Sequence, residues 1–255
     1  MRIQCERPIK VMNKIIGGPE PLICLPLIAK TTEALAHQVT ELMPLSPDLL
    51  EWRVDGFDSA EVPAKTLQAL ADLRAVIPSI PLIFTCRIHT EGGMRTIDQP
   101  TRLALICDAI KTGYLDIVDI ELCNSLDFIQ TIIDTAGRHN VKVILSFHDF
   151  EKTPEEGVIF ERLQRAQQMG GHIAKVAIMP NTIADVLVLL KATLKARTQG
   201  LQIPIVTIAM GAQGVITRLA GGLFGSDITF AIGKNASAPG QIPIQELRQA
   251  MALLY

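Results

Sequence analysis

The chain has 255 residues, of which 48% are hydrophobic and 20% charged, and its net charge at pH 7 is -2. This length allows two small domains or one large α/β barrel, and the apolar content excludes an intrinsically disordered chain. The 24 basic residues form no basic run, which argues against a nucleic-acid partner. Because no signal peptide and no apolar run of roughly 18 residues is found, we expect a cytoplasmic protein without a membrane partner.

The cysteines are odd in number and form no C-x-x-C pair, so a disulfide framework is not expected. Three of them lie inside apolar segments that have the character of strands or helices. We therefore predict reduced core residues with no redox or metal role at Cys5, Cys24, Cys86, Cys107 and Cys123.

Short apolar runs alternate with longer amphipathic stretches along the whole chain. Eight runs predict strands, at residues 22–27, 49–54, 81–86, 116–121, 141–147, 172–178, 203–209 and 228–232. Helical spacing follows in stretches such as 31–43, 101–113, 125–139, 182–200 and 242–255. Ser, Thr or Asn stands near several of their starts and Gly near several of their ends, as helix caps require.

Eight strand-then-helix units without a linker predict one α/β domain, a (β/α)8 TIM barrel over residues 22–255. A doubly wound sheet is disfavoured, since the first strand is not followed by a Gly-rich turn. Residues 1–21 remain as an N-terminal extension that caps the bottom of the barrel, with residues 3–12 as a small β-hairpin.

Polar side chains recur at the carboxyl ends of the predicted strands, where the active sites of such barrels lie. In chain order these residues are Glu51, Arg53, Asp55, Arg87, His89, Glu91, Asp119, Glu121, His148, Asp149, Lys175, Arg218, Ser237 and Gln241. For Asp55, His89 and Asp149 we favour solvated loop positions, because a single charged residue at a strand end is usually exposed.

Lys175 stands in the middle of the apolar run HIAKVAI, where an ammonium group would lose its hydration. A buried lysine whose pKa is lowered becomes nucleophilic and suits Schiff-base chemistry with a ketone or aldehyde. The alternative is a structural lysine paired with Asp119 or Glu121. Position alone leaves both interpretations open.

His148 ends the strand before Lys175, so both side chains could face one reacting centre, with His148 as the proton-transfer group. A structural histidine is the alternative. No H-x-H or H-E-x-x-H pattern occurs, which argues against zinc, although one His with several carboxylates could hold another divalent metal. Arg53, Arg87 and Arg218 would converge on the mouth and bind a carboxylate or phosphate.

In several linked segments the chain resembles the type I 3-dehydroquinate dehydratases of the shikimate pathway. These segments are EWRVD, FTCR with the following EGG, DIVDIEL, ILSFHDF, AKVAIMP, TRLAGGLFGS and TFAIGKNASAPGQI. The resemblance runs from about Leu22 to the C-terminus, in order and with compatible spacing.

The resemblance implies a homodimeric barrel, without metal or cofactor, that converts 3-dehydroquinate to 3-dehydroshikimate by syn elimination in chorismate and aromatic amino acid biosynthesis. By this resemblance Lys175 forms the imine with the substrate, His148 transfers the protons, and Glu91 orients His148. It assigns the substrate carboxylate to Arg218. Substrate binding around the ring is assigned to Glu51, Arg53, Arg87, Ser237 and Gln241, while Asp119 and Glu121 would tune Lys175.

The chain departs from the family at Pro26, where many members have a small hydroxyl residue that touches the substrate, so the first strand is left out of the site. The main alternative is a class I aldolase or transaldolase-like Schiff-base barrel that acts on a sugar phosphate. A non-catalytic acid-binding barrel and a metal-dependent sugar isomerase are weaker alternatives.

Overall fold

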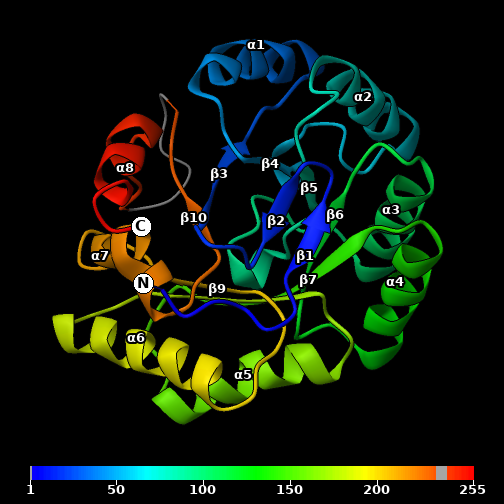
Figure 1. Ribbon diagram of the computed structural model, residues 1–255. Coiled ribbons are helices and arrows are strands. Elements are labelled where there is room, and N and C mark those ends of the chain that lie inside the picture. Colours follow the sequence, from blue (N-terminus) through cyan, green and yellow to red (C-terminus); the bar gives the residue numbers. More distant parts are fainter. Residues whose placement is uncertain (1, 234–239) are drawn as a thin grey trace.

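The computed structural model describes residues 2–233 and 240–255, and within them eight parallel strands curl into a nearly closed barrel (Figure 1). The sheet order is β10-β3-β4-β5-β6-β7-β8-β9. The strands are β3 (Leu22–Leu27), β4 (Leu49–Arg53), β5 (Leu82–Thr85), β6 (Ile117–Glu121), β7 (Lys142–Asp149), β8 (Ile173–Ile178), β9 (Ile205–Ala209) and β10 (Ile228–Phe230).

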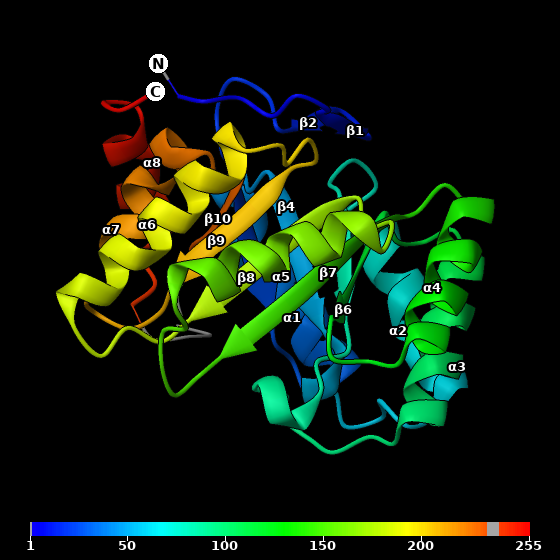
Figure 2. The same cartoon turned by 90° about the horizontal axis from the view of Figure 1, so that it is seen from below.

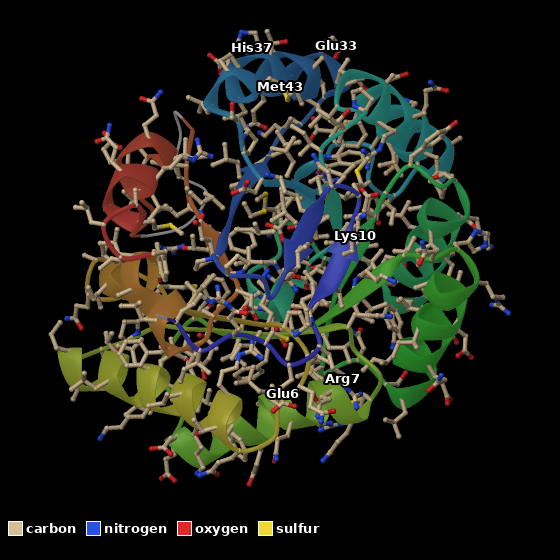
Figure 3. All side chains as sticks on the ribbon, viewed as in Figure 1. Glu6, Arg7, Lys10, Glu33, His37 and Met43 are labelled. Carbon is tan, nitrogen blue, oxygen red and sulfur yellow. The ribbon has the colours of Figure 1, made fainter. Side chains whose placement is uncertain are left out.

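The helices form a ring outside the strands (Figure 1). They are α1 (Thr32–Leu42), α2 (Pro63–Val76), α3 (Gln99–Lys111), α4 (Leu126–Arg138), α5 (Glu156–Gln168), α6 (Ile183–Thr198), α7 (Val215–Ala220) and α8 (Ile244–Met251). Side-chain caps fix several starts, including Thr31 before α1, Ser125 before α4 and a capping box between Thr182 and Asp185 before α6. The outer face of α1 is polar, and Glu33 and His37 point away from the barrel (Figure 3).

The barrel closes between β9 and β10 through bonds at the start of β10. Asp227 N donates to Ile205 O at 2.7 Å, and Ile205 N donates to Asp227 Oδ2 at 2.8 Å. The Asp227 carboxylate also pairs with Arg2 and Arg197, and all three side chains are buried. These charges are paired, as buried charges must be, and they join the N-terminal segment and α6 to this seam.

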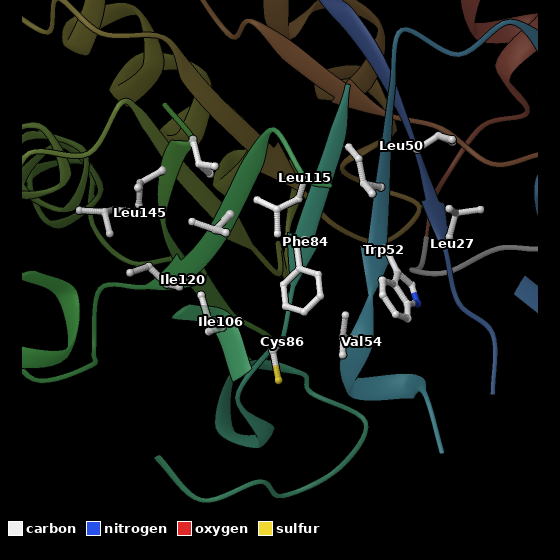
Figure 4. Close-up of a cluster of buried hydrophobic side chains, with 14 of the residues drawn as sticks. Leu27, Leu50, Trp52, Val54, Phe84, Cys86, Ile106, Leu115, Ile120 and Leu145 are labelled. Atoms are coloured by element: carbon white, nitrogen blue, oxygen red, sulfur yellow. The ribbon is translucent and has the colours of Figure 1, made fainter. Parts of the chain in front are cut away.

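Alternate strand residues face opposite sides and build two apolar layers. Outward residues such as Leu50, Trp52 and Phe84 pack beneath the helices, and the Trp52 and Phe84 rings meet edge to face with centroids 5.7 Å apart (Figure 4). Inward residues fill the bottom of the barrel, among them Leu49 and Ile117. Further up, the inward positions are polar, which leaves the ionisable groups at the carboxyl ends.

An antiparallel hairpin, β1 (Ile9–Val11) and β2 (Lys14–Ile16), lies across the end where the barrel strands begin (Figure 2). Its Val11 and Ile16 pack into the same apolar cluster as the inward residues of the barrel. The hairpin was expected at residues 3–12 and lies further along the chain. Met12, at φ 52°, makes the turn, so the strands pair on both sides of Met12 and Asn13.

The structure confirms the predicted (β/α)8 barrel with an N-terminal hairpin. All eight predicted strands are present, and their ends differ by up to two residues; most are shorter than predicted, whereas β7 runs two residues further, to Asp149. The division into residues 1–21 and 22–255 stays a prediction. The five cysteines are free, and four are buried as predicted, but the prediction of a core position is wrong for Cys123, which is exposed. Among residues 2–233 and 240–255, no helix combines the length and apolar character needed to cross a membrane.

Candidate active site

A cavity opens at the carboxyl ends of the strands, with about 550 Å³ of space, part of it open to solvent. It brings eight of the nine predicted site residues together. Its lining comprises Glu51, Arg53, Arg87, Glu91, His148, Lys175, Arg218 and Gln241, with the side chains of Phe150, Ala177, Ile208, Met210 and Phe230. No β3 residue is among them in the described chain, in line with leaving Pro26 out of the site. Ser237, the ninth predicted residue, lies outside the described residues.

Lys175 is held at the floor of this cavity and is only 5% exposed. Its Nζ donates to Asp119 Oδ2 at 2.8 Å and lies 3.6 Å from Glu51 Oε1. It also lies 4.7 Å from the centre of the Phe230 ring. The contact expected for a structural lysine is therefore present with Asp119 and absent with Glu121. A lysine whose ammonium is bound on one side and whose other side faces an open cavity can still meet a ligand carbonyl.

His148 and Glu91 form a second pair in the cavity. His148 Nδ1 lies 3.0 Å from Glu91 Oε2, and the same oxygen accepts from the His148 backbone N at 2.8 Å. Burial, Arg87 and Lys175 hold the pKa of His148 well below its ordinary value. Burial raises the pKa of Glu91 to about 7. With Nδ1 directed at Glu91, the neutral ring presents Nε2 as its base.

Arg87 is buried and bound beneath the cavity. Its Nη1 lies 2.9 Å from Asp119 Oδ1 and 2.9 Å from Glu121 Oε1, and donates to Ser146 Oγ at 2.7 Å. Although burial alone would raise it, the pKa of Asp119 is held far below its ordinary value by Arg87 and Lys175. Asp119 therefore stays ionised between Arg87 and Lys175. The Arg87 charge that reaches the cavity is partly compensated by Asp119 and Glu121.

Asp55 was expected to be solvated, and that expectation is wrong, because its side chain is fully buried. Arg53 donates to it twice, from Nε at 2.9 Å and from Nη2 at 2.7 Å. Its carboxylate also accepts from the backbone N of Arg87 and Met94. Asp55 thus fixes the Arg53 guanidinium at the mouth. By contrast, His89 is exposed, as expected. Asp149 is the last residue of β7 and is half-buried, and its Oδ1 accepts from the backbone N of Glu151 and Lys152.

Arg218 enters the cavity from α7 and donates from Nη1 to Phe230 O at 3.1 Å. Burial lowers its pKa to about 10. An anion bound in the cavity would offset that cost of burial.

Two aromatic side chains that line the cavity were not predicted from the sequence. Phe150 follows the HD of strand β7, is partly exposed, and lies stacked at 6.4 Å from the His148 ring. A Cβ at Gly92, whose φ is +84°, would come within 2.4 Å of the Phe150 ring, so glycine permits this close approach. Phe230 contacts Lys175 from β10. Both positions look like ordinary strand or loop aromatics, and only the barrel geometry brings them to the cavity.

In the described part of the chain, no three His, Cys, Asp or Glu side chains are grouped so that they could hold a metal ion. The carboxylates of the site are instead each paired with a cation or a histidine, as described above.

Comparison with known proteins agrees with this geometry. A family model described as type I 3-dehydroquinase matches residues 23–255. The 3-dehydroquinate dehydratase of Bacillus licheniformis is 40% identical over 250 residues, which are 98% of each chain.

Solved structures give the same result. Type I 3-dehydroquinate dehydratase from Clostridium difficile, solved with covalently modified comenic acid, has a TM-score of 0.95 and 40% identity, and the match covers 98% of both chains. The 3-dehydroquinate dehydratase from Geobacillus kaustophilus has a TM-score of 0.96 at 40% identity over 100% of this chain and 98% of that one. With its barrel, its cavity and these matches, the chain belongs to the type I 3-dehydroquinase family.

Proposed function

We propose that the chain dehydrates 3-dehydroquinate to 3-dehydroshikimate through an imine formed on Lys175. Membership of the family makes it a hydro-lyase of the shikimate pathway. The observation that carries the mechanism is a buried lysine at the floor of an ionised cavity, 2.8 Å from Asp119, with a neutral histidine in the same cavity.

Lys175 Nζ attacks the C3 carbonyl carbon in its neutral form, and the C–N bond replaces C=O with loss of water. The resulting imine draws electrons from C2, so a C2 proton becomes acidic. Asp119 and Glu51, both close to Nζ, then stabilise the positive charge of the protonated imine. The protonated imine would thus use the same contacts with Asp119 and Glu51 that the ammonium group of a structural lysine would make.

His148 removes the C2 proton through Nε2, and the electron pair shifts toward the imine nitrogen. The electron pair then returns from the enamine nitrogen, so that C=N re-forms and C1=C2 forms as the C1–O bond breaks, and the same imidazolium gives its proton to the departing C1 hydroxyl, which leaves as water. Glu91 keeps Nδ1 bound and so holds Nε2 toward the cavity. His148 is suited to this task because its lowered pKa keeps it neutral at pH 7. Water finally hydrolyses the imine and frees Lys175.

The remaining groups bind the substrate. Arg218 takes its carboxylate, while Glu51, Arg53, Arg87 and Gln241 meet the polar ring substituents from around the cavity. Ser237 keeps the same expected role. The contact of Arg53 with Asp55 supports this proposal, since a guanidinium that is already oriented loses little entropy on binding.

No metal or cofactor has a part in this mechanism. The purified chain, given 3-dehydroquinate, is expected to raise the ultraviolet absorbance of a conjugated enone, and an excess of chelator should leave the rate within about twofold of the untreated rate. A sugar phosphate should give no product. The proposal is wrong if 3-dehydroquinate gives no enone, and loss of the rate on chelation would favour a metal-dependent enzyme instead.

We also infer that the chain forms homodimers, through an apolar stripe on α6. Ile183, Leu187 and Leu194 are 63%, 53% and 37% exposed, and their spacing places them on one face of the helix. Light scattering should give a mass twice that of the 27.8 kDa chain. Leu187→Glu should lower it to the monomer mass, whereas Leu126→Glu, at an exposed leucine of α4, should not. A monomeric natural chain would refute the inference. The cytoplasmic location stays a prediction.

A further inference from the structure

A row of alternating charges runs through the barrel wall from α3 to Lys175. Arg102 Nη2, on α3, lies 2.7 Å from Glu121 Oε2. The other oxygen of Glu121 lies 2.9 Å from Arg87 Nη1, and the same Nη1 lies 2.9 Å from Asp119 Oδ1. Asp119 Oδ2 then accepts from Lys175 Nζ at 2.8 Å. Every member is buried, so water screens none of these contacts effectively.

Arg102 is the member of the row at the end away from Lys175. Like Asp119 and Glu121 it is absent from the cavity lining, and it is 3% exposed. Its guanidinium is fixed on each side, since Nε donates to Cys86 O at 3.2 Å and Nη1 to Asn124 Oδ1 at 3.3 Å. It also lies 5.4 Å from the centre of the Phe128 ring. A side chain this well held can act on Lys175 only through Glu121 and Arg87.

The charges of the row cancel when Glu51 is counted with them. Arg102, Arg87 and Lys175 are cations, and Glu121 and Asp119 are anions, with Glu51 as the third anion beside Lys175. Because buried charges are compensated only by their neighbours, removing one member leaves an uncompensated charge inside the wall. The structure assigns Arg102 a part in the reaction as a positioning residue. By binding one oxygen of Glu121, it leaves Arg87 on Asp119 and sets the charge that Lys175 meets.

Loss of the Arg102 charge would give Glu121 a stronger hold on Arg87 and leave Asp119 more fully to Lys175. Both changes stabilise the ammonium form of Lys175, and imine formation needs the neutral amine. Activity would therefore begin at higher pH. Among the described residues, the charged or titratable groups around Lys175 or lining its cavity are Cys24 on β3, Glu51 and Arg53 on β4, Arg87 and Glu91 after β5, Asp119 on β6, His148 on β7 and Arg218 on α7. None of them is altered by the substitutions proposed below.

A double-mutant cycle tests this inference, which rests on the proposed function of Lys175. The readout is the acid limb of kcat/KM, which reports the free enzyme. Arg102→Met leaves the row and Glu51 with one net negative charge and should move the acid limb to higher pH by about one unit. Glu121→Gln, with one net positive charge, should move it down, and the double variant should return it toward the natural position. Arg102→Lys keeps the charge and should stay near it.

Arg197→Met is the matched control, because Arg197 is a buried arginine paired with Asp227 at the other end of the barrel. It should lower stability and leave the limb in place. Unmoved limbs in the cycle, or shifts of the two single variants in one direction, would overturn the inference. If the Arg102→Met protein does not fold, the test still decides the question, because Glu121→Gln and the double variant must differ in the pH of their acid limbs.

The failure of the proposed function gives a different result. Reduction of the natural enzyme with substrate should trap the substrate on Lys175. If no adduct forms there, the proposed function fails, whereas an adduct combined with unmoved limbs refutes only the role of Arg102.

Discussion

Replacing Lys175 with methionine is expected to lower kcat/KM for 3-dehydroquinate by at least about 10⁴-fold, because among the described residues Lys175 is the only lysine that lines the cavity. Methionine has a similar length and fills the same space above Asp119. Asp119 keeps Arg87 as a partner, so the barrel should still fold. The rate is measured from the enone absorbance, and circular dichroism checks the fold.

Lys195→Met is the matched control for this change. Lys195 lies on α6, pairs with Glu156 and covers the Phe160 ring outside the barrel. It should retain nearly the natural rate. A Lys175→Met enzyme that keeps more than about a hundredth of the natural rate would contradict the role of Lys175, because a lost nucleophile costs far more.

Replacing His148 with alanine is expected to lower turnover by about 10²- to 10⁴-fold while imine formation persists. In the proposed mechanism the neutral ring is the base at pH 7, since burial, Arg87 and Lys175 hold the pKa of His148 well below the ordinary value. Alanine removes that base and leaves Lys175 and its contact with Asp119 in place. In this variant turnover should therefore fall, while borohydride still traps the substrate on Lys175.

His89→Gln is the control for the histidine change, because His89 is exposed and contacts only Gly93 O through Nδ1 in the described chain. It should keep both turnover and adduct. If His148→Ala lost the adduct and retained rapid elimination, another group would be the base.

The sequence predicted the barrel and its polar mouth well, because both depend on local patterns. Strands buried on both faces read as apolar runs, and Lys175 and Glu51 interrupt such runs at inward positions. The order of strands around a barrel then follows the order in the chain. Placing the polar strand ends at one mouth needed no knowledge of side-chain contacts.

The contacts within the mouth could not be predicted, because they depend on which neighbours meet across the barrel. Asp55 resembles a solvated loop residue until the fold brings Arg53 and two backbone N–H groups to it. Similarly, Asp119 and Glu121 both point inward from β6, yet only Asp119 reaches Lys175. Glu121 lies nearer the mouth and binds Arg87 and Arg102 instead.

The positions of Arg102 and the hairpin show the same limit. Arg102 stands in an amphipathic helix, where an arginine is usually solvated, and only the fold brings Cys86 O, Glu121 and Asn124 around it. The hairpin lies at residues 9–16 and not at the predicted residues 3–12. Its turn is made by Met12, whose positive φ cannot be predicted from a methionine.

The most direct test of the central claim is reduction of the natural enzyme with borohydride in the presence of 3-dehydroquinate, followed by peptide mass spectrometry. We expect one substrate-derived adduct, located on Lys175, together with loss of activity. An enzyme that forms the enone product and is neither modified nor inactivated by this treatment would contradict it, as would an adduct confined to another lysine.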